Sequence, residues 1–116
     1  MQISEREAGT VTVVDLSGRM TLGDGDILLN DKLRSLAQQG KKNVLLNLSH
    51  VNYVDSAGLG ALVSGYTTIT RNGGTLKIAN VTTRLQDLLS ITKLLTVFES
   101  FDNEEEALRS FKVAAN

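Results

Sequence analysis

The stretch from residue 54 to residue 63 reads V54-D55-S56-A57-G58-L59-G60-A61-L62-V63. An acidic residue, a hydroxyl and two glycines stand at the start of an apolar run in which no charged side chain follows until Arg71. The apolar residues recur at the spacing of one helical face, which predicts a helix from Ser56 to Arg71. Its predicted core side consists of Leu59, Leu62, Val63, Tyr66 and Ile69.

Helices and strands alternate along the rest of the chain. Short apolar or β-branched runs between turn-forming residues predict strands at 1–6, 11–17, 44–48, 75–79 and 95–98. Helical spacing predicts a first helix ending near residue 40, a third helix at 83–90 and a last helix that begins at 102–106 with a solvated run of glutamates. The inward stripe of the first helix is predicted as Ile27, Leu28, Leu33, Leu36 and Ala37.

The order β-β-α-β-α-β-α-β-α indicates an α/β fold. We expect a small mixed sheet of about four or five strands with about four helices packed on it. The first two strands, joined by a short turn, are predicted to be antiparallel, and the later ones, joined through helices, parallel.

Size and composition restrict the classes of function. The chain has 116 residues, 41% hydrophobic and 22% charged, so one domain over residues 1–116 is expected. The net charge of -1 provides no basic surface for nucleic acid. No apolar segment approaches the roughly 20 residues that cross a bilayer, and the first residues lack the pattern of a secretory signal, so we expect a cytoplasmic protein with no membrane partner. Cysteine is absent, which excludes disulfides and thiolate metal sites.

Several chemistries use a hydroxyl at a strand-to-helix turn. A hydrolase nucleophile needs a base and oxyanion donors, but the chain has a single histidine, His50, and lacks the Gly-x-Ser-x-Gly string. Gly58 and Gly60 could bring backbone amides close to a phosphate, but neither common nucleotide-binding motif is complete. Asp24 and Asp26 alternate with glycines and are interpreted as a capping loop rather than a metal site. We therefore expect no catalytic residue, no metal and no cofactor in this chain.

The outer side of the predicted helix 56–71 carries small, uncharged residues where a surface helix normally carries Lys and Glu. Two neighbouring lines run along it, Gly58, Ala61, Gly65 and Thr68, and beside them Ala57, Gly60, Ser64 and Thr67. A glycine inside a helix costs up to ~1 kcal/mol relative to alanine, so these glycines require a reason. Either the domain covers both sides of the helix, or this is a flat docking face that a partner's backbone approaches closely.

Ser56 lies at the edge of this face and at the amino terminus of the helix. An unmodified serine there is a favoured N-cap. Phosphorylation would add about -1.5 to -2 charges, which the helix amides would accommodate although Asp55 would oppose them. A partner built to close over small neutral groups would instead meet a hydrated dianion, whose burial is unfavourable. The residues thus predict a switch in binding rather than in folding.

Three strings of the chain carry a resemblance to a known family. They are L46-N47-L48-S49-H50-V51-N52-Y53-V54-D55-S56-A57-G58-L59-G60, G73-G74-T75-L76-K77-I78 and L85-x-x-L88-L89-x-I91-T92-K93-L94. With S17-G18 after the second strand and the last helix, they cover nearly the whole chain. In this order they resemble a STAS domain, the family of anti-sigma factor antagonists, for which Asp-Ser-x-Gly-Leu-Gly after a buried strand is a fairly specific signal.

The resemblance implies a non-enzymatic antagonist with Ser56 as phosphoacceptor. In this family an anti-sigma factor that is also an ATP-dependent serine protein kinase phosphorylates the serine at this position, and the kinase binds the ATP. The unphosphorylated antagonist binds that factor and frees sigma factor; phosphorylation ends the binding, and a PP2C-type phosphatase restores it. The alternative is a STAS adaptor module, in a signalling scaffold or lipid-transport complex, without control by phosphate.

Two positions differ from the family pattern. Antagonists often carry Gly-Glu-apolar-Asp after the second strand, whereas this chain has Gly18-Arg19-Met20-Thr21, so Arg19 and Thr21 indicate a different partner contact. Ala57 stands where many relatives have a second hydroxyl, which leaves Ser56 as the only acceptor in the motif. The residues expected to bind the partner are Asp55, Ser56, Ala57, Gly58, Gly60, Ala61, Ser64, Gly65, Thr68, Arg19 and Thr21.

Overall fold

The computed structural model describes the backbone of residues 1–114 and the side chains of residues 1–111. Ala115 and Asn116, which the predicted domain includes, lie outside the described residues. The elements are β1 (Gln2–Ala8), β2 (Val11–Met20), α1 (Gly25–Gln38), β3 (Asn43–Val54), α2 (Ser56–Arg71), β4 (Thr75–Ala79), α3 (Thr83–Ile91), the 3-10 helix η1 (Leu94–Thr96), β5 (Ser100–Phe101) and α4 (Glu104–Ala114). The order is the predicted one with a 3-10 helix added.

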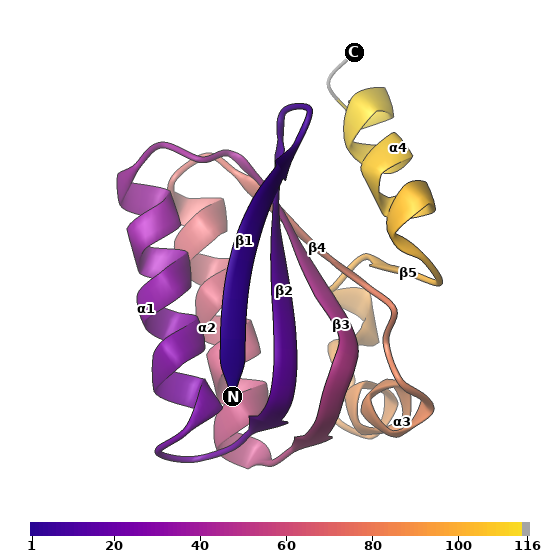
Figure 1. Cartoon of the computed structure of the whole chain (residues 1–116). Helices are drawn as coiled ribbons and strands as arrows, with labels where there is room; N and C mark the ends of the chain where they lie inside the picture. The colour runs from indigo at the N-terminus through magenta and orange to yellow at the C-terminus, as the bar shows by residue number, and fades with distance from the viewer. Residues whose placement is uncertain (115–116) are drawn as a thin grey trace.

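The strands form one mixed sheet in the order β1-β2-β3-β4-β5. β1 pairs antiparallel with β2 and the other neighbours pair parallel, as predicted. Figure 1 shows α1 and α2 side by side on one face of the sheet and α4 on the other. β2 and β3 are parallel and each leads into a helix, so α1 and α2 both begin at the end of the sheet where the carboxyl ends of these strands lie.

Two apolar clusters fix the helices to the sheet. The larger lies between the sheet and α1, α2 and α3, and includes the fully buried Leu33, Leu46 and Leu62. The smaller lies under α4, where Ala107 and Phe111 are buried. Burying an aliphatic side chain of this size contributes about 1.5–3 kcal/mol, so the larger cluster stabilises the fold most.

β2 and β3 are longer than predicted. β2 continues to Met20 and β3 to Val54, whereas the predicted ends were residues 17 and 48. Gly18, interpreted as a terminator, has a φ of 104° between two register shifts, so the strand continues through a bulge. β3 therefore ends one residue before Asp55.

The predicted edge strand at 95–98 is wrong. This segment forms η1 and a turn, and the edge strand is the two-residue β5. The chain turns at Lys93, whose φ is 63°. Phe98 then enters the core, with its ring centroid 5.5 Å from that of Tyr66. The prediction failed because a largely apolar run of four residues is too short to show a periodicity, and periodicity is what distinguishes a strand from buried turns.

The inward side of α1 also differs from the predicted stripe. Ile27 and Leu28 are 55% and 44% exposed, whereas Leu29 is fully buried. The buried residues of α1 are Gly25, Leu29, Leu33, Leu36 and Ala37. From Leu29 onward these follow the spacing i, i+4, i+7, i+8 of one helical face, which Ile27 and Leu28 do not share.

The glutamates that open α4 are only partly the solvated cluster that was expected. Glu104 accepts a hydrogen bond from Arg6 Nη1 at 2.9 Å, and Arg6 Nε donates to Asp15 at 2.7 Å. The backbone N–H of Glu106 donates to Asn103 Oδ1 at 2.8 Å, so Asn103 supports the first turn. Arg6 thereby ties the start of α4 to β1 and β2.

Candidate functional site

Asp55, rather than Ser56, caps helix α2. Its Oδ1 accepts a hydrogen bond from the backbone N–H of Gly58 at 2.9 Å. Its Oδ2 accepts from the backbone N–H of Leu22 at 3.1 Å. These amide donors, Gly58 foremost, lower the pKa of Asp55 below its usual value. The carboxylate thus fixes both the start of α2 and the loop after β2.

Ser56 is the first residue of α2 and is exposed. Within residues 1–111 its hydroxyl makes no hydrogen bond to another protein group, because Asp55 already fills the capping position. The serine therefore has no evident role in holding the helix end. Its oxygen is open to an incoming molecule.

His50, the histidine considered as a base, does not serve Ser56. It lies within β3 opposite Ser17 of β2. Its Nδ1 stands 3.1 Å from the Oγ of its own neighbour Ser49. The nucleophile-to-base hydrogen bond that activates a catalytic serine is therefore not formed among the described residues.

One of the two lines of small residues is buried inside the protein. Gly58, Ala61 and Gly65 are all buried. A Cβ added at Gly58 would lie 2.0 Å from the Met20 carbonyl oxygen, and one added at Gly65 would lie 2.1 Å from Leu33 Cδ1. The prediction that these three residues contact a partner is therefore wrong: they let α2 pack directly on the end of β2 and on α1.

The other line faces solvent. Ser56, Gly60 and Ser64 are exposed at four-residue intervals, and a Cβ added at Gly60 would meet nothing within 4 Å. Thr68 donates its hydroxyl to the Ser64 carbonyl at 3.0 Å, so its donor is already used within the helix. We call this surface the small-residue face; it consists of Ser56, Ala57, Gly60, Ser64, Thr67 and Thr68, of which Ala57, Thr67 and Thr68 are half-buried.

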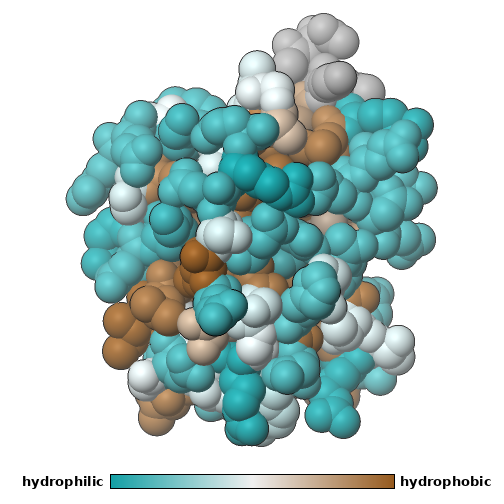
Figure 2. All heavy atoms as spheres, in the orientation of Figure 1, coloured by the Kyte–Doolittle hydropathy of each residue, from teal (hydrophilic) through white to brown (hydrophobic). Residues whose placement is uncertain are grey.

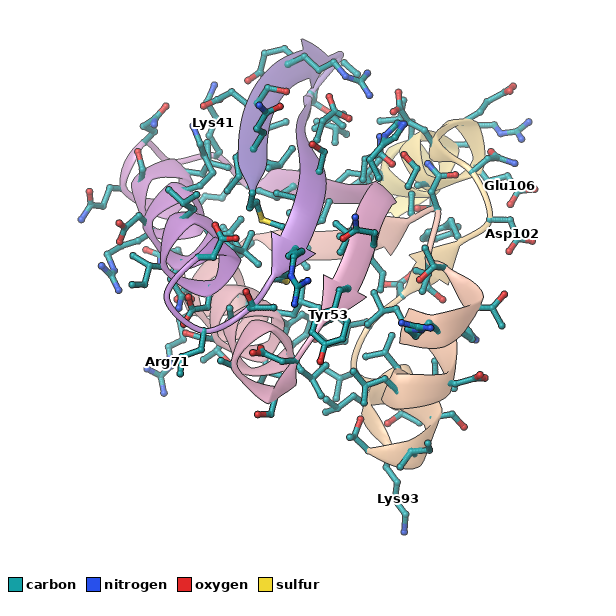
Figure 3. The ribbon with its side chains drawn as sticks, turned by 60° about the horizontal axis from the view of Figure 1, so that its bottom comes forward. Lys41, Tyr53, Arg71, Lys93, Asp102 and Glu106 are labelled. Atoms are coloured by element: carbon teal, nitrogen blue, oxygen red, sulfur yellow. The ribbon has the colours of Figure 1, made fainter. Side chains whose placement is uncertain are left out.

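Arg19 and Thr21, the predicted contact residues at and just after the end of β2, differ in exposure and in role. Arg19 is exposed, and its guanidinium carbon stands 4.9 Å from the centre of the Tyr53 ring. Figure 3 shows Tyr53 near the carboxyl end of β3, where it pairs in register with Arg19. Thr21 is half-buried, and its carbonyl accepts hydrogen bonds from the N–H groups of Asp24 and Asp26. Arg19 is thus a surface group near the start of α2, whereas Thr21 shapes the turn into α1.

Large aliphatic side chains are exposed near the start of α1, at a place that no sequence motif indicates. We call Leu22, Ile27 and Leu28 the aliphatic patch; Leu22 is 77% exposed. Figure 2 shows hydrophobic surface at the lower left, over the loop after β2 and the first turns of α1. A signal was present in the sequence, because Ile27 and Leu28 fall outside the stripe that begins at Leu29. Tyr53 was also missed, and no motif marks it.

The acidic residues of this loop contact nitrogen groups of the chain itself: an amino group in the case of Asp24 and backbone amides in the case of Asp26. Asp24 Oδ1 lies 3.0 Å from the amino nitrogen of Met1. Asp26 Oδ1 accepts from the N–H groups of Gly23 at 2.9 Å and Ile27 at 2.8 Å, and so supports the turn into α1. Asp24 occupies the N-cap position without a side-chain capping bond. Among residues 1–111, no three His, Cys, Asp or Glu side chains gather in a way that could hold a metal ion.

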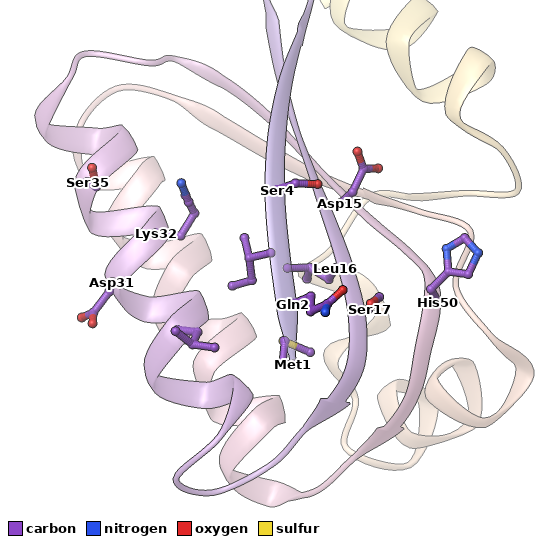
Figure 4. A pocket seen from close by; sticks show the side chains of 12 residues that line it. Met1, Gln2, Ser4, Asp15, Leu16, Ser17, Asp31, Lys32, Ser35 and His50 are labelled. Atoms are coloured by element: carbon purple, nitrogen blue, oxygen red, sulfur yellow. The ribbon is translucent and has the colours of Figure 1, made fainter.

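A groove of about 800 Å³ lies along β1 and α1. Figure 4 shows Asp31, Lys32 and Ser35 on the α1 side of it. Its lining includes Leu28 of the aliphatic patch but no residue of α2. The groove is therefore separate from Ser56.

The comparison with protein families decides the classification. The STAS domain model matches residues 2–107, which contain every strand and most of the helical residues. The chain belongs to the STAS domain family. The predicted family and the predicted mixed α/β sheet are both confirmed. No helix of this STAS domain, within the described residues, is long and apolar enough to span a membrane.

Two curated relatives of this chain are anti-sigma factor antagonists. This STAS domain is 25% identical over 115 residues to an anti-sigma F factor antagonist of Paenibacillus polymyxa, covering 99% of this chain and 98% of the relative. It is 34% identical over 86 residues to an anti-sigma-B factor antagonist of Bacillus subtilis, covering 74% and 77% respectively.

Solved structures share the fold. SpoIIAA, a Bacillus cell fate determinant solved in its phosphorylated form, superposes with a TM-score of 0.74 at 16% identity, covering 95% of this chain and 99% of that one. At this level of identity the likeness concerns the fold of the STAS domain and not the roles of individual residues.

Proposed function

We propose that this STAS domain is an anti-sigma factor antagonist whose binding is switched off by phosphorylation of Ser56. The carrying observation is the Ser56 hydroxyl, which is exposed, makes no hydrogen bond within the described residues and borders the small-residue face. The names of the Paenibacillus and Bacillus relatives support the antagonist function. The phosphorylated form of SpoIIAA supports control by phosphate.

The unphosphorylated protein binds an anti-sigma factor that is also a serine protein kinase, which then releases sigma factor. The small-residue face suits this role, because Gly60 and Ser64 let a partner's backbone come close. Between Ser56 and Arg71, α2 carries no charged side chain that a partner would have to desolvate. Depletion of charge is typical of the centre of a protein interface.

Phosphoryl transfer takes place within the complex. The Ser56 Oγ attacks the γ-phosphorus of ATP held by the kinase, and the new O–P bond forms as the bond from that phosphorus to the β–γ bridging oxygen breaks. ADP leaves, and the hydroxyl proton passes to a basic group of the kinase. A PP2C-type phosphatase restores the serine by hydrolysis with water, releasing inorganic phosphate. This chain supplies the acceptor oxygen and binds no cofactor of its own.

The phosphate ends binding without unfolding the protein. It stands at the amino terminus of α2, where the helix dipole favours negative charge, and Asp55 continues to cap the helix. A partner closing over the small-residue face would have to bury a dianion without a counterion, which is strongly unfavourable.

The test is incubation with ATP and the kinase-type anti-sigma factors of the source genome, followed by mass mapping. We expect one phosphate at Ser56 and none in Ser56→Ala. The Ser56→Asp variant should no longer bind the anti-sigma factor that binds the unphosphorylated protein. Its melting temperature should stay within a few degrees of the wild-type value. Phosphate elsewhere, or none with any such factor, would contradict the proposal.

Two further outcomes discriminate the alternatives. If the Ser56→Asp and Ser56→Ala variants both form the complex as stably as the wild type, the protein is an adaptor module without control by phosphate. Ester hydrolysis that disappears in Ser56→Ala would identify an enzyme.

A further inference from the structure

The aliphatic patch concentrates exposed apolar surface at one end of the molecule. Leu22, Ile27 and Leu28 are 77%, 55% and 44% exposed, and they are three of the five large hydrophobic residues exposed in the described part of the chain. The other two, Tyr53 and Ile91, lie on β3 and at the end of α3. Large apolar side chains that gather at one place mark interaction sites, unlike those that occur singly.

Polar contacts hold the patch in place before any partner arrives. The N–H of Leu22 donates to Asp55 Oδ2 at 3.1 Å. The N–H groups of Gly23 and Ile27 both donate to Asp26 Oδ1, at 2.9 Å and 2.8 Å. A partner that docks on the patch therefore does not have to order this loop, which reduces the entropic cost of binding.

The patch and Ser56 lie at the same point of the fold. A Cβ added at Gly25 would lie 2.8 Å from the Met20 Cα, and one added at Gly58 would lie 2.0 Å from the Met20 carbonyl oxygen. The first turns of α1 and α2 thus both touch Met20. Leu22 is joined to this point directly, because its N–H donates to Oδ2 of Asp55, the residue before Ser56. A molecule that covers Ser56 therefore reaches the patch at Leu22.

Unpaired acidic groups border the patch. Asp24 pairs with the Met1 amine, but Asp26 and Asp55 form no ion pair with Lys or Arg among residues 1–111. The exposed Arg19 lies over the Tyr53 ring and pairs with neither carboxylate. Two copies brought together through this face would oppose Asp26 and Asp55 to the same residues of the other copy, and these carboxylates also disfavour an anionic lipid surface. A pocket that is apolar at its centre and carries Lys or Arg at its rim complements both features.

We propose that the aliphatic patch is the anchor by which the anti-sigma factor holds this antagonist, with Leu22 and Ile27 inserted into an apolar pocket whose basic rim faces Asp26 of α1 and not Ser56 of α2. The proposal rests on the proposed function, because it assigns the patch to the same partner. The small-residue face allows the kinase to approach Ser56, and the aliphatic patch supplies affinity. A few side chains that fill well-packed, desolvated pockets near the centre of an interface account for most of its binding energy.

The test compares Leu22→Ser/Ile27→Ser with Ile91→Ser as matched control. Both variants remove exposed aliphatic side chains, so both should fold like the wild type by circular dichroism and melting temperature. Binding is measured by calorimetry with the anti-sigma factor that phosphorylates the wild type, together with the rate of phosphate incorporation at Ser56. We expect at least tenfold weaker binding and slower phosphorylation for the double variant, and wild-type behaviour for Ile91→Ser. Asp26→Asn should reduce the salt dependence of association.

The outcomes separate the anchor from the switch. Unchanged binding of the double variant, with Ser56→Asp still inactive, would overturn the anchor and leave the proposed function intact. Failure of the wild type to bind or accept phosphate from any factor would overturn both. A wild-type dimer in sedimentation, or binding to phosphatidylglycerol vesicles, that the double variant loses would assign the patch to a second copy or to lipid and overturn the anchor.

Discussion

The two lines of small residues on α2 are alike in composition and opposite in environment. Gly58, Ala61 and Gly65 are buried. Met20 occupies the space that a Cβ at Gly58 would need, and Leu33 occupies the space that a Cβ at Gly65 would need. A Cβ added at Gly60, on the other line, would meet nothing within 4 Å. Small residues in a helix therefore indicate close approach, but they do not say whether the approaching group belongs to the same chain or to another. Substitutions on the two lines should therefore have opposite effects on folding.

Gly58→Ala should destabilise the protein most. The added methyl group would lie 2.0 Å from the Met20 carbonyl oxygen, and a main-chain atom at the end of β2 cannot move aside as a side chain would. We expect a loss of about 3 kcal/mol in the free energy of unfolding, despite the higher helix propensity of alanine. Urea unfolding measures it. A loss below about 1 kcal/mol would mean that α2 does not pack this tightly on β2.

Gly65→Ala should destabilise less, because the obstacle is the end of a side chain. The methyl group would lie 2.1 Å from Leu33 Cδ1, which can rotate at some cost in packing. We expect a loss of about 1–2 kcal/mol. A double-mutant cycle supplies the control: in a Leu33→Ala background, Gly65→Ala should be neutral or stabilising. Additive losses would contradict direct contact between the two residues.

Asp55→Asn should change the pH dependence of stability. The pKa of Asp55 is lower in the folded protein than its ordinary value, so the carboxylate stabilises the fold above about pH 3.9. This contribution is lost as pH falls through the lowered folded-state pKa. Thermal melts from pH 7 to pH 2 should show the variant less stable near neutrality and the two curves converging in acid. Parallel curves would show that the hydrogen bonds from Gly58 and Leu22 do not favour the charged form.

Gly60→Ala should stabilise the protein slightly. The position is helical, exposed and open, so alanine gains up to ~1 kcal/mol from helix propensity without a clash. Urea unfolding beside Gly58→Ala provides the direct comparison between the two lines. A destabilised Gly60→Ala would mean that this side of α2 is also covered.

Ser64→Lys should leave folding unchanged, to within about 0.5 kcal/mol. The side chain projects from the exposed line, so the charge remains in water in the free protein. Binding to the anti-sigma factor should weaken at least tenfold, because the lysine would be buried against a neutral interface. Thr70→Lys, at the exposed far end of α2, is the control. Equal binding by the two lysine variants would remove the small-residue face from the interface.

Local spacing in the sequence was sufficient to predict much of this protein. The helix from Ser56 to Arg71 has its predicted bounds, since its apolar period is regular and Asn72-Gly73-Gly74 ends it. The element order and the parallel pairing followed from strands that alternate with helices. Three strings of the sequence, among them the one around Ser56, carried the resemblance to the STAS family, which the family model over residues 2–107 confirms.

The rest depended on neighbours that are distant in sequence. Leu22 donates to the carboxylate of Asp55, 33 positions further along the chain, and no local pattern records that bond. Which line of small residues is buried was decided when α1 packed beside α2, since both lines have the same kind of side chain. The period of a helix is set by hydrogen bonds between residues four apart, so a short stretch of sequence is enough to reveal it. Burial depends on which surface the sheet brings alongside, and this is set by long-range pairing of β2 with β3, which only the tertiary structure contains.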